Sequence, residues 1–506
     1  MSEPQITQSV EHKDDTPELG FEIIKTRVVK SIALLTGRTF ILQIISLGAT
    51  FLLTIFLNPA EFGTFFIVSA VISFLTYFSD IGLAAALIQK KESLTQKELQ
   101  TTFTIQQCLV ISLVLLVFVL TSFIQNWYHL NSGSVYLLWA LAISLFLSSL
   151  KSIPSVLLER RLDFNKLVLP QIAEALVYNF VAVILAWKGF GVASFAWAVL
   201  LRGLVGLFLI YWLQPWKPGF AFDQVTLKGL LRYGLPYQLN TFLAVAKDDG
   251  MTVVLGSILG VSNIGLLGWA QKWASAPLRF FMDQVIKVTF PAFARLQHDK
   301  DQLSQTVSRS LFFISLLVFP SIVGLITLAP ILVQIIPKYQ KWQPALLALS
   351  LISINTAWAA ISTPLTNLLN AIGKITLTFK LMVMWTVLTW LLLPILSLEY
   401  GVNGAAWGYA LVGFSSIVAI KVASKYATIN FIEVVGKPLL AAFLMSIAIV
   451  TLSRILPQDF WSVLILAIVG LVVYLLVLRL LIGQVFITDL KNIFNLIRSK
   501  ERKTAL

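Results

Sequence analysis

The chain has little charge, one cysteine and three histidines. Charged residues are 12% of its 506 residues, whereas a soluble domain carries about 25%. So few charges cannot cover the surface of an ordinary soluble protein. The single cysteine, Cys108, excludes an intrachain disulfide. His12, His129 and His298 lie far apart in predicted loops, so we expect no histidine metal site.

Motifs of common enzymes are also missing. No segment has the spacing of a Walker phosphate-binding loop, and no serine, histidine and aspartate follow the pattern of a nucleophile triad. The predicted outer loops are too short to carry a catalytic domain. We therefore expect that the protein is not an enzyme and that it uses neither a cofactor nor a metal.

The sequence contains many long apolar runs. Hydrophobic residues are 58% of the chain, and a helix needs about 20 apolar residues in a row to cross a bilayer. The sequence therefore predicts an all-α integral membrane protein with about fourteen transmembrane helices. The predicted spans are 39–57, 63–88, 100–124, 135–151, 168–187, 193–213, 234–258, 263–286, 309–328, 343–366, 377–397, 403–421, 437–456 and 460–481.

The basic residues indicate the orientation of these spans. With both termini in the cytoplasm, most of the 38 lysines and arginines fall in inner segments. The outer loops then contain only Lys188, Lys338, Lys341 and Arg454. Because basic loops stay on the cytoplasmic side, we expect a multi-pass protein with both termini inside. The same loops account for the net charge of +14 without a nucleic-acid partner.

The two ends of the chain differ from the spans. Residues 1–20 are polar, without the apolar run of a cleavable signal peptide, and we expect them to be disordered. Residues 21–37 and 486–506 each place apolar side chains on one helical face and basic side chains elsewhere. That pattern is typical of helices that lie on the lipids of the inner leaflet.

An internal repeat relates two halves of the chain. Residues 190–197 return 210 residues later, in altered form, as residues 400–407. Residues 57–63 are similarly related to residues 259–265, at an offset of 202. Duplicated halves in a membrane protein are typical of transporters with a substrate path between the halves. The larger offset covers six predicted spans, an even number, so both halves should have the same orientation.

The repeat and the apolar runs together predict the organisation of the chain. The expected parts are a disordered cytoplasmic segment (1–20), an N-lobe of six helices (21–213), a C-lobe of six helices (214–425), two further helices (426–485) and a basic amphipathic tail (486–506).

Charged residues within predicted spans are the main functional candidates, because hydrocarbon is a costly environment for them. The basic ones are Arg202, Lys247, Lys272 and Arg279, and the acidic ones are Asp80, Glu174, Asp248, Asp249 and Asp283. Some have structural interpretations. Asp80 can cap a helix or pair with a lysine, and Glu174, about a turn and a half inside its span, can extend its carboxylate toward the membrane surface. Arg279 and Asp283 are one turn apart and can pair with each other.

Lys247, Asp248 and Asp249 are the strongest of these signals. They are three adjacent charges near the middle of a predicted span. Successive helical residues point about 100° apart, so the three cannot all meet one partner. Either they form a salt bridge between helices, with Lys272 or Arg202, or at least one of them faces a wet cavity and contacts a substrate or an ion.

Several motifs, taken in their order along the chain, resemble a known family. They are residues 57–63, 78–90, 154–164 with their Leu158-Glu159-Arg160-Arg161, 290–293 and 401–407. The chain is similar over about residues 21–425 to the Wzx-type O-antigen and exopolysaccharide flippases. These belong to the MOP superfamily, which includes the MATE drug exporters and the lipid II flippases.

The resemblance implies a fold and a function. The fold would be two parallel six-helix bundles in a V-shaped, MATE-like arrangement around a central cavity. The function would be to move an undecaprenyl-diphosphate-linked oligosaccharide across the bacterial inner membrane by alternating access, for lipopolysaccharide, capsule or exopolysaccharide synthesis. Glycosyltransferases and a glycan polymerase would be further partners.

On this reading the four basic candidates would bind the pyrophosphate and sugar, and Asp248 and Asp249 would bind a coupling ion. Two alternatives are a lipid II flippase, which differs in the sugar, and a MATE-like cation-coupled multidrug exporter. The exporter would need an acidic cavity, whereas Arg202 and Lys247 would repel a cationic drug.

Overall fold

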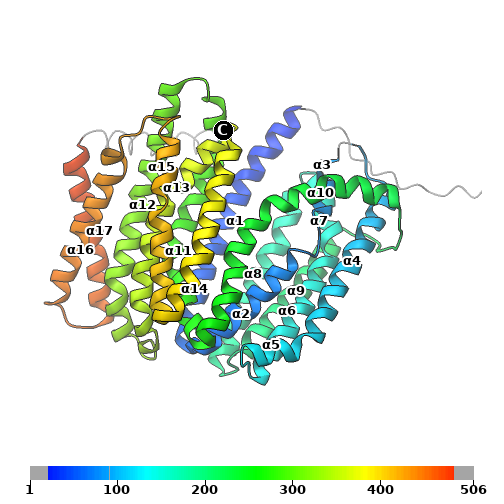
Figure 1. Cartoon of the computed structure of the whole chain (residues 1–506), viewed down its shortest axis with the longest axis horizontal. Helices are drawn as coiled ribbons and strands as arrows, with labels where there is room; N and C mark the ends of the chain where they lie inside the picture. The colour runs from blue at the N-terminus through cyan, green and yellow to red at the C-terminus, as the bar shows by residue number, and fades with distance from the viewer. Residues whose placement is uncertain (1–20, 91, 484–506) are drawn as a thin grey trace, which may run out of the picture. The chain divides into compact units, whose positions relative to one another are not determined.

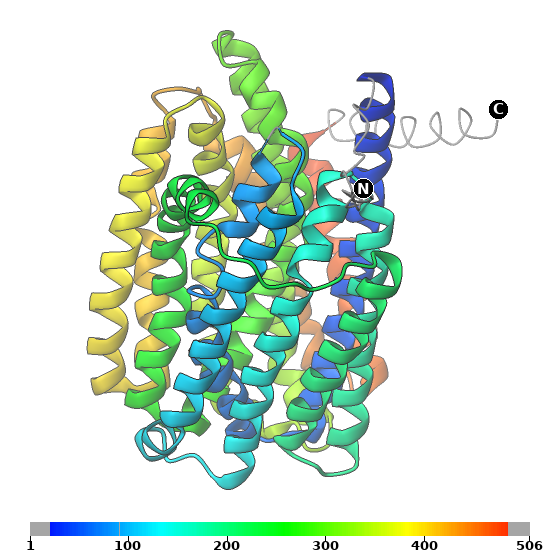
Figure 2. The ribbon, with the colours of Figure 1, turned by 90° about the vertical axis from the view of Figure 1, so that its right-hand side faces the viewer.

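The structure is a computed structural model that describes residues 21–90 and 92–483. Its described residues are helical, without strands (Figures 1 and 2). The predictions for residues 1–20 and 486–506 lie outside this part. The helices of the first half are α1 (Phe21–Phe56), α2 (Pro59–Thr76), α3 (Leu83–Gln89), α4 (Gln96–Val119), α5 (Thr121–Trp127), α6 (Ser132–Leu150), α7 (Ser152–Arg160), α8 (Phe164–Trp187) and α9 (Ala193–Leu213).

The second half continues with α10, a π-helical turn η1, and further helices (Figure 1). Their bounds are α10 (Gln224–Val245), η1 (Ala246–Gly250), α11 (Met251–Arg295), α12 (Lys300–Ile335), η2 (Gln340–Ala345), α13 (Leu346–Ala371), α14 (Ile375–Phe414), α15 (Ile417–Ala423), η3 (Ile432–Gly436), α16 (Lys437–Ser453) and α17 (Phe460–Ile482).

Twelve helical segments among the described residues are long and apolar enough to cross a membrane. The predicted count of fourteen is therefore not confirmed. Two of the twelve are unusually long, with 54 residues in Phe242–Arg295 and 49 in Ile375–Ala423. Each contains a glycine with non-helical backbone, Gly260 (φ 75°) or Gly401 (φ 58°). Glycine adopts positive φ without steric cost, so the chain can bend there while the helical residues continue on both sides.

Two predicted boundaries are wrong. A surface helix over 21–37 was expected to end before the first span, but α1 is one helix of 36 residues. Gly37 alone separates the amphipathic pattern of 21–37 from the apolar pattern of the first span. Because one glycine destabilises a helix by only about 1 kcal/mol, the helix continues through it. The second span was expected to reach residue 88, but α2 ends at Thr76. Ile81 and Gly82 both have positive φ, which no α-helix accommodates.

The repeat is visible in the backbone as well as in the sequence. Positive φ is uncommon outside glycine, so its recurrence at equivalent places is informative. Three pairs of positive-φ residues are separated by 209 to 211 positions: His129 and Lys338, Leu162 and Gly373, and Gly191 and Gly401. The two halves therefore turn at corresponding places even where their side chains differ.

The repeated segments 57–63 and 259–265 pack against each other through glycine. A Cβ atom on Gly63 would lie 1.7 Å from the carbonyl oxygen of Val261, and one on Gly265 would lie 1.8 Å from that of Pro59. Val261 and Pro59 are related by the same offset as the two glycines. The contact is therefore reciprocal, and each glycine allows the other segment's backbone to approach.

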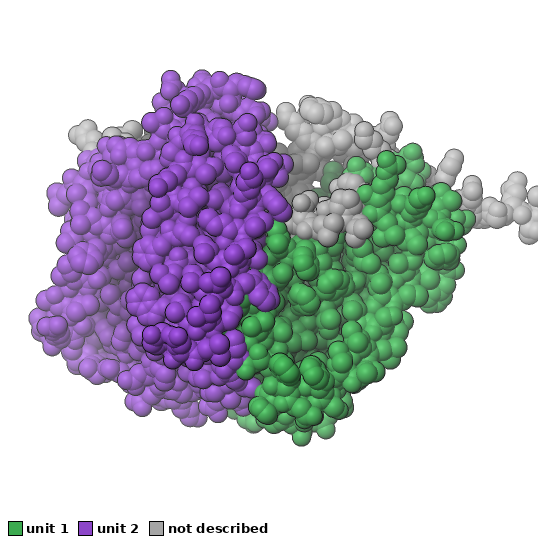
Figure 3. Space-filling model, viewed as in Figure 1, with its two compact units in different colours: residues 1–57, 64–257 green, residues 58–63, 258–506 purple. Residues whose placement is uncertain are grey.

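The described chain forms two compact units (Figure 3). Unit 1 contains the described residues up to Leu57 and Thr64–Ser257, and unit 2 contains Asn58–Gly63 and the described residues from Ile258 onward. Unit 1 includes α10, which packs against α3 and α4. The boundaries of the units thus differ from those of the predicted lobes at 21–213 and 214–425. The two lobes remain a prediction that rests on the sequence repeat.

Unit 1 is built on helices α1, α8, α9, α6 and α4, each packed against the next in that order. At one end of the unit, α3, α4, α7 and α10 share an apolar cluster that includes Leu87, Phe103 and Ile153. The Arg160 guanidinium donates hydrogen bonds of 2.6–2.8 Å to the carbonyls of Leu87, Lys90 and Glu92. This arginine, from the family-like motif in 154–164, fixes the loop after α3.

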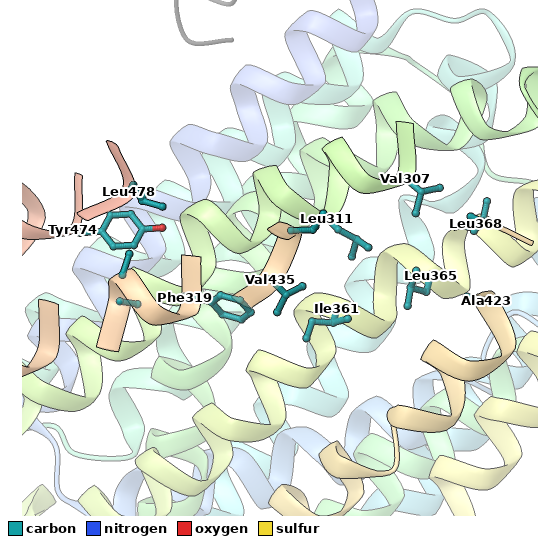
Figure 4. Packing of buried hydrophobic residues seen from close by; sticks show 14 of the residues in the cluster. Val307, Leu311, Phe319, Ile361, Leu365, Leu368, Ala423, Val435, Tyr474 and Leu478 are labelled. Carbon is teal, nitrogen blue, oxygen red and sulfur yellow. The ribbon is translucent and has the colours of Figure 1, made fainter. Parts of the chain in front are cut away.

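Unit 2 has an extensive buried cluster where α12 meets α13, α16 and α17 (Figure 4). Leu311 and Phe319 of α12 pack with Ile361 of α13 and with Tyr474 of α17. The Tyr474 hydroxyl donates to the Leu316 carbonyl at 2.8 Å. The two helices predicted over 426–485 are therefore packed onto α12 as part of this unit.

Candidate functional site

The adjacent charges Lys247, Asp248 and Asp249 lie on η1, the π-helical turn between α10 and α11. A π turn holds an extra residue and so changes the direction of the side chains around it. Such turns inside α-helices are frequent at functional sites. The strongest sequence signal thus coincides with a local departure from α-helical geometry.

The charges of η1 interact locally. The Lys247 Nζ lies 2.5 Å from the Asp248 Oδ1, and 69% of the Asp248 side chain is exposed. Asp249 accepts a hydrogen bond from the Ser73 hydroxyl of α2. Asp248 pairs with its neighbour Lys247, and Arg202 pairs with Glu174, so the interhelical salt bridge with Arg202, one of the two sequence interpretations, is not the arrangement of these residues. The Asp248 carboxylate is therefore accessible.

One face of α2 joins this turn. Ser69, Ser73 and Tyr77 follow each other at intervals of four residues, so they lie along one side of the helix and its end. Tyr77 exchanges two hydrogen bonds with Gln238 of α10: its hydroxyl donates to the Gln238 carbonyl, and its carbonyl accepts from Gln238 Nε2 at 2.5 Å. The Tyr77 ring also lies 5.5 Å from that of Phe242.

We name Ser69, Ser73, Lys247, Asp248 and Asp249 the η1 patch. The Ser69 hydroxyl is buried and has no hydrogen-bond partner among the described residues. Sequence reasoning missed Ser69 and Ser73, because a single serine in an apolar helix is common. Their four-residue spacing on α2 was the available signal.

A second group of charges lies on α11 of unit 2. Lys272 and Arg279 are seven residues apart, which places them on the same side of the helix two turns apart. Both are exposed, and their like charges interact. Asp283 is also exposed. Neither Lys272 nor Asp283 has an ion-pair partner in the part of the chain that the structure describes, so the expected pair between Arg279 and Asp283 is absent. We name Lys272, Arg279 and Asp283 the α11 stripe.

Arg202 belongs to a different group of residues in unit 1. Its Nε lies 3.5 Å from the Glu174 Oε2, and its guanidinium lies 5.9 Å from the centre of the Tyr178 ring. Glu174 also accepts a hydrogen bond of 2.6 Å from Lys151. The structure therefore pairs two of the candidate residues, Arg202 and Glu174, with each other.

Asp80 is not within a membrane-spanning helix, contrary to the prediction. It lies in the turn between α2 and α3, where its carboxylate accepts a hydrogen bond of 3.2 Å from the Ala84 N–H. Gln106 Nε2 lies 3.4 Å from the same oxygen. Burial raises the pKa of Asp80, and no lysine or arginine among the described residues forms an ion pair with it. Its contacts are those of a helix cap.

The side chains of the η1 patch and the α11 stripe are of types that bind phosphate, protons and small cations. Lysine and arginine hold phosphate through charge-assisted hydrogen bonds. Carboxylates beside serine hydroxyls can hold a proton or a small cation. Charged, accessible groups within apolar helices are costly unless they meet water or a ligand.

Comparison with known proteins relates the chain to proteins of polysaccharide biosynthesis. The profile of a family described as polysaccharide biosynthesis protein matches residues 52–347. The succinoglycan biosynthesis transport protein ExoT of Rhizobium meliloti (strain 1021) is 25% identical over 447 residues, which are 86% of this chain and 87% of ExoT.

Solved structures share the fold. The lipid II flippase MurJ in an inward closed conformation matches with a TM-score of 0.72 and 19% identity, over 90% of this chain and 99% of MurJ. An inward-facing MATE family multidrug transporter of the MOP superfamily matches with a TM-score of 0.56 and 16% identity, over 76% of this chain and 95% of that protein. These likenesses confirm the predicted MATE-like helical fold.

Proposed function

The chain belongs to the polysaccharide biosynthesis protein family, and from this premise we propose that it is a flippase for a lipid-linked oligosaccharide repeat unit. The observation that carries the proposal is the presence of exposed cations and carboxylates on membrane-spanning helices of a transporter fold. The proposed substrate is an undecaprenyl-diphosphate-linked oligosaccharide that crosses the bacterial inner membrane, while both termini stay in the cytoplasm. Glycosyltransferases and a glycan polymerase would act before and after it.

The physical chemistry of such a substrate fits the residues. Its sugars and pyrophosphate cannot cross about 30 Å of hydrocarbon unaided. Lys272 and Arg279 of the α11 stripe, both in unit 2, offer cations to the pyrophosphate. Outward movement of two negative charges is favoured by about 4–5 kcal/mol at a membrane potential of 100 mV, negative inside. The potential therefore aids transport in the direction of polysaccharide export.

The carboxylates of the η1 patch suit ion coupling. Asp249 accepts a hydrogen bond from Ser73, and Asp248 pairs with its neighbour Lys247 among the described residues. Binding of a proton or a sodium ion would change the charge of this turn next to the Tyr77–Gln238 hydrogen bonds that join α2 and α10. The patch can thereby link ion binding to helix movement in alternating access.

A transport assay tests the proposal. The purified protein is placed in proteoliposomes with a fluorescent undecaprenyl-diphosphate oligosaccharide, and its movement between leaflets is followed. We expect Lys272→Ala combined with Arg279→Ala to lower the rate by about tenfold or more, since each charged hydrogen bond contributes about 1.5–3 kcal/mol. Lys188→Ala, which removes an exposed cation at the end of α8, is the matched control.

Two alternatives give different results. A lipid II flippase would move lipid II but not the polysaccharide precursor, and depletion of the protein would lyse cells without changing a surface polymer. A multidrug exporter would move a cationic drug, and removal of Lys272 and Arg279 would increase that activity. Flipping that is undiminished in the double variant would contradict the assigned binding residues.

A further inference from the structure

A cluster of charged residues in unit 1 is not used by the η1 patch. It lies where α1, α6, α8 and α9 meet, and its centre is Glu174. Lys151 of the α6 end donates to Glu174 Oε1 at 2.6 Å, and Arg202 of α9 lies 3.5 Å from Glu174 Oε2. Arg38 of α1 donates to the side-chain oxygen of Gln171, which precedes Glu174 by three residues on the same helical face.

Tight helix packing produces this cluster. A Cβ atom on Gly206 of α9 would lie 1.8 Å from the Glu174 Oε1. The glycine therefore leaves the space that the carboxylate occupies against α9. Glu174 lies about 15 Å along α8 from its first residue, at 1.5 Å per residue. The charges are thus well inside a helix that is apolar enough to span the membrane.

The charges of the cluster do not balance. Glu174 is the carboxylate that pairs within this cluster, whereas Arg38 of α1, Lys151 just after α6 and Arg202 of α9 bring three positive charges. Lys166 of α8 is separate, since it pairs with Asp163. Uncompensated positive charge within membrane-spanning helices is costly and favours the binding of an anion.

The two cations around Glu174 are not equivalent. Lys151 and Glu174 are 16% and 13% exposed and lie close together, while Arg202 is 51% exposed and more distant from the carboxylate. The buried Nε of Arg38 has no hydrogen-bond partner among the described residues. Arg202 is therefore the cation most available to an incoming ligand. Glu174 is the internal anion that competes with such a ligand for Arg202.

We propose that Arg202 forms a binding site for the phosphate of a lipid, with Glu174 as the internal anion that this phosphate displaces from Arg202. Leu201, the neighbour of Arg202 on α9, is exposed and offers apolar surface to a hydrocarbon chain. The lipid is either an anionic phospholipid or the phosphate-bearing carrier lipid. In the second case the inference rests on the proposed function.

The experiment measures lipid binding by the full-length protein in nanodiscs, without any transport step. The probes are undecaprenyl phosphate and phosphatidylglycerol, each titrated against a phosphatidylcholine background. Arg202→Gln should weaken binding by about tenfold, because a charge-assisted hydrogen bond is lost. Glu174→Gln should strengthen it by about as much, because the competing anion is removed. A merely structural role for Glu174 would not predict this opposite sign.

Controls separate binding from folding and from transport. Lys188→Gln, at the far end of α8, should leave the affinity unchanged. Arg202→Lys should keep part of the affinity, and thermal unfolding of each variant checks that the protein is folded.

The two probes identify the lipid. Tighter binding of undecaprenyl phosphate identifies the carrier lipid, and equal binding of both probes identifies phospholipid. Affinity that is unchanged in Arg202→Gln, or lowered in Glu174→Gln, would overturn the site even if the protein is a flippase. A chain that binds the phosphate lipid but flips none would contradict only the proposed function.

Discussion

At the scale of residues, the sequence identified charged side chains within predicted spans but not the partners of those side chains. Lys247, Asp248 and Asp249 were identified by their adjacency, and the structure adds the π turn beneath them and the hydrogen bond from Ser73. Arg202 was assigned to substrate binding by its depth, but its pairing with Glu174 depends on how α8 and α9 pack. Contacts between residues distant in sequence cannot be read from the spacing within one helix.

Asp80 gives a prediction that depends on pH. Burial raises its pKa in the folded protein, so its ionisation opposes folding, and stability falls as the pH rises from the unfolded value of about 3.9 through the folded value. Asp80→Asn keeps an acceptor for the Ala84 N–H and removes the charge. We expect it to raise the melting temperature at pH 7 by a few degrees and to have no such effect below pH 4.

Asp80→Ala is the control for the hydrogen bond. It removes both the charge and the acceptor at the start of α3, and loss of a cap costs about 1 kcal/mol. At pH 7 it should therefore be less stable than Asp80→Asn. A pH-independent difference between Asp80→Asn and the wild type would argue against the role of the charge.

At the scale of elements, glycine decides how the helices turn and how closely they approach. Gly260 and Gly401 have positive φ where two long helical segments bend, and Gly63 and Gly265 admit each other's backbone. The sequence showed these glycines as parts of the repeat. It did not show which of them form a bend and which a contact, because both uses require only the absence of a side chain.

The reciprocal contact predicts a large effect of one methyl group. In Gly265→Ala the new Cβ would lie 1.8 Å from the Pro59 carbonyl oxygen, so backbone must move. We expect a loss of about 1–3 kcal/mol, typical of overpacking, measured as a lower melting temperature in detergent. Gly48→Ala is the matched control, since nothing lies within 4 Å of its Cβ. Within helix α1 it should be neutral or stabilising by up to about 1 kcal/mol. Equal effects of the two changes would refute the contact.

At the scale of the whole molecule, amino-acid composition determines that the protein lies in a membrane. A chain that is 58% hydrophobic and 12% charged must bury its surface in lipid. The polysaccharide biosynthesis family and the MATE-like fold follow the helix pattern and the repeat that the sequence already contains. The asymmetric placement of lysine and arginine predicts the orientation, with both termini in the cytoplasm.

Orientation gives the prediction at this scale. In a Cys108→Ser background, a membrane-impermeant maleimide should label Gln458→Cys in intact spheroplasts, because that residue lies in the predicted outer loop between α16 and α17. His298→Cys, in the inner loop before α12, should be labelled only after the membrane is opened. Both positions are exposed. The reverse pattern would place both termini outside and contradict outward export.

The sequence by itself determined the membrane environment, the helical class and the duplication. These depend on composition and on periodicity along the chain, which are local properties. Only the tertiary structure decided that α1 is continuous, that Asp80 caps a helix outside the spans, and that Glu174 lies between Lys151 and Arg202. Those outcomes depend on which helices pack together and on where a single glycine allows two helices to approach closely. Hydrophobic periodicity along the chain encodes neither of these properties.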